Sequence, residues 1–313
     1  MASDYTISGL SKSVLKTLVY YDLFDYPLTP EEIFRHLPSN NVTLEDIKTE
    51  LSHLTNRSFV HRLGEFYSLQ NEPTLESRRL KGNALAKKHV AIAVRRSSLI
   101  ASFPFVQGVM ISGSLSKGYA DEKSDVDFFV VTRPGRLYIA RTLLALYKRL
   151  FLFNSHKYFC INYFISSDHL TIKEHNIFTA TELATLLPMY GSQLYVELLT
   201  TNSWIQAYFP NFKFRNSAPL PCPENNPTFF KKAVEWTFNR CWPDALDCSL
   251  MKFTFNRWKR LYGNYEMADF QLAFRTNRHA SKGHKHNYQK QVIARYEARI
   301  QSFIKSFQIN LAT

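Results

Sequence analysis

The residues best suited to chemistry lie in one short stretch, between Ile111 and Val131. An apolar run ends in Gly113-Ser114, and a second begins with Asp125-Val126-Asp127, with ten residues between Ser114 and Asp125. Gly113 would let the backbone approach a phosphate closely, and Ser114 and the amides of the next turn would donate hydrogen bonds to it. Asp125 and Asp127, two apart on a strand, project from one face. Two such carboxylates repel each other unless a cation lies between them, and Mg²⁺ with a triphosphate suits that position.

This arrangement resembles the DNA polymerase β-like nucleotidyltransferase superfamily, whose signature joins Gly-Gly or Gly-Ser to Asp-x-Asp or Asp-x-Glu through a short spacer. The resemblance implies a Mg²⁺- or Mn²⁺-dependent enzyme that transfers a nucleoside monophosphate from an NTP to a hydroxyl acceptor, which the sequence does not identify. It implies that Asp125 and Asp127 hold the metal and that Gly113 and Ser114 hold the triphosphate. Ser116 would be a second phosphate donor. Lys117 would neutralise the β- and γ-phosphates, or would simply be an exposed lysine on a turn.

Active members of the superfamily usually carry a third carboxylate on a later central strand. In the β-rich run from Tyr158 to Ser166 the polar position between apolar neighbours is Asn162, which keeps a carbonyl ligand but cannot accept a proton. General-base catalysis supplies roughly 10²–10⁴-fold, or about 3–5 kcal/mol of barrier lowering. Several alternatives stay open: another carboxylate substitutes, Asp168 being nearest in sequence; the acceptor loses its proton unaided; the strand aligns differently; or the domain binds nucleotide without turnover. The last alternative describes a regulatory protein with a degenerate nucleotidyltransferase fold that binds nucleotide, protein or nucleic acid.

The elements that must position these residues predict an α/β (α+β) fold, with a small mixed sheet of the nucleotidyltransferase type and helices around it. This nucleotidyltransferase-like α/β domain is expected to cover residues 76–209. The expected elements are a long basic helix at 76–101, strands at 105–112, 126–132 and 158–166, and helices at 136–153 and 179–187.

Residues 1–75 predict a winged-helix-like domain, because three short helices precede a hairpin. The helices are expected at 11–24, from the Thr29-Pro30 start to about Leu37, and from Thr43 to Leu54; the hairpin strands are expected at 59–63 and 66–69. The third helix of such domains often reads DNA. Here that helix exposes Glu45, Asp46 and Glu50 against Lys48 and Arg57. An acidic helix repels phosphates, so the pattern favours protein contact or dimerisation over DNA binding.

Residues 210–313 predict a helical, basic and aromatic-rich C-terminal region. A Pro- and Asn-rich segment at 210–228 precedes helices at 229–262 and 287–307. The surrounding Lys and Arg residues favour a basic loop or solvated surface over a metal site for His279, His284 and His286. The helical setting favours the core over base stacking for the aromatic side chains, which are Trp236, Phe238, Trp242, Phe253, Phe255, Trp258 and Tyr262.

Composition limits the function classes. The chain has 313 residues and a formal charge of +13. Residues 1–75 carry 6 basic against 10 acidic side chains, so the remaining residues carry 33 against 16 and would attract a polyanion. The longest apolar stretch, Thr142–Phe153, is shorter than the ~18 residues of a membrane helix, so no membrane role is expected. The N-terminus lacks the features of a secretory signal, and the four cysteines form no C-x-x-C pair, which predicts a cytoplasmic protein.

Overall fold

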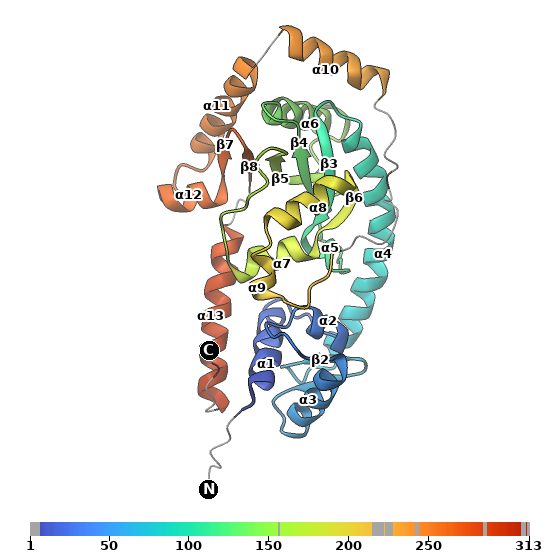
Figure 1. Ribbon diagram of the computed structural model, residues 1–313, viewed down its shortest axis with the longest axis vertical. Helices are drawn as coiled ribbons and strands as arrows, with labels where there is room; N and C mark the ends of the chain where they lie inside the picture. The colour runs from blue at the N-terminus through green and yellow to red at the C-terminus, as the bar shows by residue number, and fades with distance from the viewer. Residues whose placement is uncertain are drawn as a thin grey trace.

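A six-stranded mixed sheet lies at the centre of the protein (Figure 1). The computed structural model describes residues 7–155, 157–214, 222, 228–241, 244–283, 287–307 and 311. The strand order is β6-β3-β4-β5-β8-β7, in which β4 and β5 are parallel and all other neighbours are antiparallel. The strands are β3 (Val106–Ser112), β4 (Asp127–Thr132), β5 (Cys160–Ser166), β6 (Leu187–Tyr190), β7 (Thr276–Asn277) and β8 (Ala280–Lys282).

Helices cover both faces of this sheet because its central strands are apolar on both sides. On one face, Ile111 and Val130 pack into a core with α4 (Thr74–Ala101) and α6 (Leu137–Phe151). On the other, Met110 and Val131 pack against α7 (Ile177–Thr185), α8 (Ser192–Thr201) and α9 (Ile205–Tyr208). The short α5 (Gly113–Ser116) follows β3 directly. The predicted α+β class and central strands are therefore confirmed.

The N-terminal residues form a separate core beneath the sheet in the orientation of Figure 1. The helices and hairpin appear in the predicted order, and Thr29 and Glu32 form the capping box that starts the second helix. No comparison identifies this unit as a winged helix, and that assignment stays a prediction. Its elements are α1 (Gly9–Asp22), α2 (Pro30–Arg35), α3 (Leu44–Asn56), β1 (His61–Leu63) and β2 (Phe66–Ser68).

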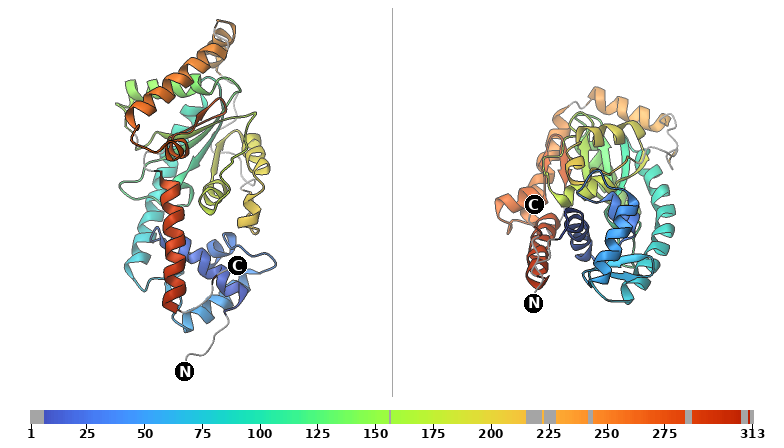
Figure 2. Two further views of the ribbon diagram at one scale, coloured as in Figure 1. Left: turned by 90° about the vertical axis from the view of Figure 1, so that its left-hand side faces the viewer. Right: turned by 60° about the horizontal axis from the view of Figure 1, so that its bottom comes forward.

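The C-terminal region is helical as predicted but does not stand apart from the rest. It adds β7 and β8 to the sheet edge, where Lys282 pairs with Tyr163 of β5. Its last helix, α13 (Tyr288–Phe307), returns to the N-terminal unit, where Val292 and Phe303 join the core around α1 (Figures 1 and 2). The other helices are α10 (Phe229–Cys241), α11 (Asp244–Leu261) and α12 (Met267–Ala273). No helix in the described part of the chain combines the length and apolar character of a membrane crossing.

Candidate functional site

The Gly113-Ser114 bend and the Asp-x-Asp pair meet where β3 ends and β4 begins. These strands are antiparallel neighbours with Ser112 opposite Asp127, so the residue that follows β3 lies beside the first residue of β4. Gly113 has a φ of +70°, and a Cβ atom there would lie 2.5 Å from Oδ2 of Asp127. Glycine is therefore required twice at this position, by its backbone conformation and by the carboxylate against which it packs.

Asp127 lies in a strongly acidic environment. The pKa of Asp127 is raised to about 7, mainly by burial and also by the charges of Glu182 and Asp125. Asp125 is half-buried in the loop directly before β4. Because anionic carboxylates are costly this close together, a cation among their oxygens would stabilise the charged form of Asp127.

Asn162 lies at the site, as the strand alignment predicted. The β4–β5 register runs from Phe128 opposite Ile161 to Phe129 opposite Tyr163, so Asn162 falls in the irregularity between them. Its Nδ2 donates a 2.5 Å hydrogen bond to Oδ1 of Asp127 and helps to offset the rise in pKa of that carboxyl group. Asn162 thus orients the acid.

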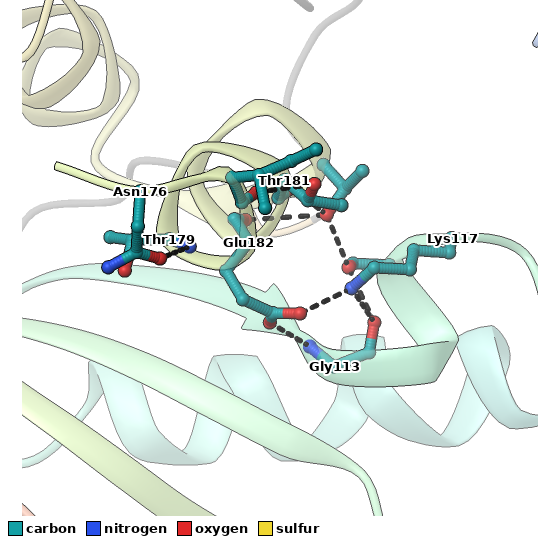
Figure 3. A network of polar contacts seen from close by, with 9 residues as sticks. Gly113, Lys117, Asn176, Thr179, Thr181 and Glu182 are labelled. Carbon is teal, nitrogen blue, oxygen red and sulfur yellow. Dashed lines mark hydrogen bonds and ion pairs between the residues drawn. The ribbon is translucent and has the colours of Figure 1, made fainter. Parts of the chain in front are cut away.

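Glu182 is the side chain that sequence reasoning missed. The backbone N–H of Gly113 donates to its Oε2 at 3.3 Å, and Lys117 Nζ lies 2.7 Å from its Oε1 (Figure 3). Lys117 also donates to the Gly113 carbonyl at 3.1 Å. One signal in the sequence could have found it, since Glu182 is the single charged residue in the segment Ile177–Thr185. Lys117 is therefore not a free surface lysine, because it is half-buried and paired with an acid.

The two serines of the motif differ in exposure. Ser114 is half-buried and lines the cavity described below. Ser116 is only 2% exposed, and its hydroxyl donates to the Gly113 carbonyl at 2.8 Å. Ser116 thus stabilises the turn, and its burial disfavours the predicted role as a phosphate donor.

These groups open into a cavity of about 630 Å³ that three parts of the chain enclose. The central sheet and the helices packed on it contribute Ser114, Asp127, Asn162 and Glu182, but Asp125 and Ser116 are not in the lining. The N-terminal unit adds residues between Tyr20 and Tyr26, and the C-terminal region adds Lys282, Tyr288 and Gln289.

Lys282 brings a buried cation into this cavity. It is 8% exposed, and its Nζ donates to Gln289 Oε1 at 2.9 Å. The pKa of Lys282 is lowered to about 8, mainly by burial and also by nearby Arg275, whereas the charge of Glu182 opposes that fall. The pairing of β8 with β5 places Lys282 opposite Tyr163, which also lines the cavity.

Asp168, the predicted substitute for a third carboxylate, lies at the wrong end of the sheet. The parallel pair places Asp127 opposite Cys160 and Thr132 opposite Ser166, and Asp168 follows Ser166. Six strand residues at about 3.3 Å each separate the two ends by about 20 Å. This correction shows that the nearest acid in sequence was a poor guide to position.

His279 lies beside Asp168 and His169. Its ring stacks on that of His169 with centroids 3.4 Å apart, and Asp168 Oδ1 lies 3.2 Å from Nδ1 of His169. The ligand atoms of these three residues lie within 4.8 Å of one another, close enough to share a metal ion. His284 and His286 lie outside the described residues, as does Trp242. Of the other aromatic residues, Phe238 and Trp258 pack in cores, but Trp236 and Phe253 are each 64% exposed.

Comparison with known proteins agrees with the motif. The family model for the nucleotidyltransferase domain matches residues 94–174, which include β3, β4 and β5. Every predicted site residue lies inside this segment, whereas Glu182 and Lys282 lie outside it. Residues 94–174 are thus similar to a nucleotidyltransferase domain, and this similarity supports a transferase function. Neither the curated proteins nor the solved structures gave a match to this chain.

Proposed function

We propose that this protein is a Mg²⁺- or Mn²⁺-dependent nucleotidyltransferase that transfers a nucleoside monophosphate from an NTP to a hydroxyl acceptor. The observation that carries the proposal is the close approach of Gly113 to Asp127 inside a ligand-sized cavity. A glycine bend facing a buried carboxylate provides a backbone surface for phosphate next to oxygen ligands for a divalent ion.

The donor set fits a hard cation. Asp125 and Asp127 would supply carboxylate oxygens, and a cation would offset both the burial and the neighbouring negative charges that raise the pKa of Asp127. When bound, Mg²⁺ would neutralise charge on the triphosphate and on the group that develops charge during transfer. The resting charge distribution therefore favours a metal at this position.

The chain's own residues would hold and orient the substrates. Ser114 and the Gly113 amide would donate to the triphosphate, and Lys117 would neutralise part of its charge. Asn162 would keep Asp127 in one orientation through the bond to Oδ1. The aromatic side chains of Tyr20 and Tyr21 line the cavity and would exclude water from the reacting groups.

A second candidate function is nucleotide binding without turnover, in a regulatory protein with a degenerate site. The observation that favours it is the amide of Asn162 beside Asp127, where a third carboxylate would accept the acceptor's proton. The variant Asn162→Asp separates the two functions. If Asn162→Asp gains turnover, the wild-type site has lost its third carboxylate, and the regulatory function is supported. If the wild type already turns over and the variant gains nothing, the enzyme function is supported.

Titration calorimetry with ATP, GTP, CTP and UTP, each with and without Mg²⁺, tests the proposed site. We expect at least one NTP to bind in the micromolar to millimolar range, Mg²⁺ to strengthen binding, and pyrophosphate to appear when a suitable acceptor is supplied. Asp127→Ala should abolish the Mg²⁺ effect. The matched control Asp168→Ala removes the same group at the other end of β5 and should preserve it. Absence of binding by all four nucleotides would remove the proposal.

A further inference from the structure

Glu182 holds the two donors that a phosphate group would need. We propose, on the basis of the proposed function, that Glu182 is a built-in competitor for the polyphosphate tail of the nucleotide. In the ligand-free state its carboxylate occupies the donors of Gly113 and Lys117, and a polyphosphate binds by displacing it. The ligand class is therefore a polyphosphate anion, and Glu182 sets the affinity with which the site accepts it.

The contacts of Glu182 are those of an anionic ligand. One carboxylate oxygen accepts from the Gly113 amide at 3.3 Å, and the other lies 2.7 Å from the Lys117 ammonium. A backbone amide together with an ammonium is the donor combination that proteins use for phosphate oxygens. The Gly113 amide has a single N–H, so it cannot serve a carboxylate and a phosphate at once, and the two anions compete for it.

The side chain can leave without disturbing its helix. Glu182 and Lys117 remain 29% and 18% exposed at their side chains, and Glu182 lines the cavity. The backbone of α7 is held independently, because Asn176 caps its first turn and Ser116 lies 3.3 Å from Thr185. Both side chains of the ion pair line the cavity, so a multivalent phosphate can reach them and replace the carboxylate there.

The surrounding charges favour the exchange. Lys117, the ion-pair partner of Glu182, stays in the cavity lining when the carboxylate leaves. Lys282 also feels the charge of Glu182 and stays inside the cavity when the carboxylate moves. The incoming anion therefore meets two ammonium groups, those of Lys117 and Lys282.

The cavity contains a matched control for charge. Glu174 lines the same cavity, but it pairs with Arg275 and has no bond to Gly113 or Lys117. Asp121 is a second acid of the lining, exposed and bonded to Ser124. Removing a negative charge at either position therefore changes the electrostatic potential of the cavity without freeing the Gly113 and Lys117 donors.

Calorimetric titration of the full-length protein with inorganic tripolyphosphate and with ATP, both in EDTA, tests the proposal. We expect Glu182→Gln to bind both ligands about tenfold more tightly than wild type, because the neutral amide competes weakly for Lys117. Glu174→Gln and Asp121→Asn should each change the affinity by less than about threefold, since long-range charge is screened. Thermal unfolding confirms that each variant is folded, and Asp121→Asn serves alone if loss of the buried ion pair unfolds Glu174→Gln.

Glu182→Asp separates occupancy from charge. It keeps the charge but shortens the side chain by one methylene group, so its carboxylate falls short of the two donors. Affinity close to that of Glu182→Gln supports displacement, and affinity close to wild type overturns it. Equal or weaker binding by Glu182→Gln, with nucleotide still bound by wild type, overturns the displacement and leaves the proposed function intact. Failure of wild type and every variant to bind either ligand overturns both.

Discussion

Among the single residues, Asp127 is a carboxylic acid whose pKa is raised to near neutrality. Its pKa lies at about 7 in the folded chain, against an ordinary value of 3.8. Between these values the folded state keeps a proton that the unfolded state has released, so the contribution of Asp127 to stability falls as the pH rises through this window and levels off above pH 7. We expect Asp127→Asn to be more stable than wild type by up to about 4 kcal/mol at pH 8 and to lose this advantage near pH 4.

Urea denaturation in EDTA between pH 4 and 8 measures this difference. Adding Mg²⁺ at pH 8 should stabilise the wild type, by about 2.7 kcal/mol at a concentration one hundred times Kd, and should leave Asp127→Asn unchanged. Parallel stability curves for the two proteins across the whole pH range would show that Asp127 is not strained by its neighbours.

At the scale of elements, the turn from β3 into α5 depends on the absence of a side chain. Gly113 and Gly118 have φ values of +70° and +76°, but only Gly113 packs against a carboxylate, and a Cβ atom at Gly118 would meet no heavy atom within 4 Å. We expect Gly118→Ala to cost about 1–2 kcal/mol through backbone strain alone. Gly113→Ala should cost more and should lose nucleotide binding, because its methyl group displaces Asp127.

Urea denaturation and ATP calorimetry on both variants test this difference. The comparison holds backbone conformation nearly constant, so any excess effect at Gly113 comes from the contact with Asp127. Equal losses in the two variants would mean that the close approach has no role in binding.

Elements with a local signal were predictable to within a few residues. The capping box at Thr29 placed the start of α2, and runs of apolar residues placed β3, β4 and β5. The strands β7 and β8 were not predicted, because they hold two and three residues and β8 pairs with β5 more than one hundred positions away. Pairing between segments so far apart leaves no periodic pattern of apolar residues that a local reading of the sequence could detect.

The residues of the candidate site likewise fall into two groups, those with a local sequence signal and those without one. Gly113 and Asp127 were predictable because a short spacer joins two adjacent strands, and register then brings them together. The prediction that Asp168 replaces the third carboxylate was wrong, because β5 runs away from the site and Asp168 follows its far end. Glu182 and Lys282 reach the site from α7 and β8 through tertiary packing, which no local spacing encodes.

At the scale of the whole molecule, the cavity depends on the N-terminal unit staying against α4. Arg79 is 4% exposed, and its guanidinium lies 2.6 Å from Glu32 Oε1 and 3.8 Å from the centre of the Tyr26 ring. Tyr26 in turn donates to the Lys117 carbonyl at 2.6 Å, beside the donors that we propose for phosphate. A single buried cation therefore links the N-terminal core to the turn that forms the site.

We expect Arg79→Met to destabilise the protein by about 3–5 kcal/mol, because it strands the Glu32 carboxylate at a buried contact. The double variant Glu32→Gln/Arg79→Met removes both charges, keeps a side-chain oxygen for the capping box with Thr29, and should recover much of that loss. Lys81→Met, an exposed position on the same helix, should stay within about 0.5 kcal/mol of wild type. Urea denaturation measures the stability of all three variants. ATP titration of the folded double variant measures what Tyr26 contributes to the site once the Arg79 guanidinium is gone.

If Arg79→Met unfolds at the same urea concentration as Lys81→Met, the N-terminal unit is held by its contacts with α13 instead, and the closure of the cavity depends on the C-terminal helix.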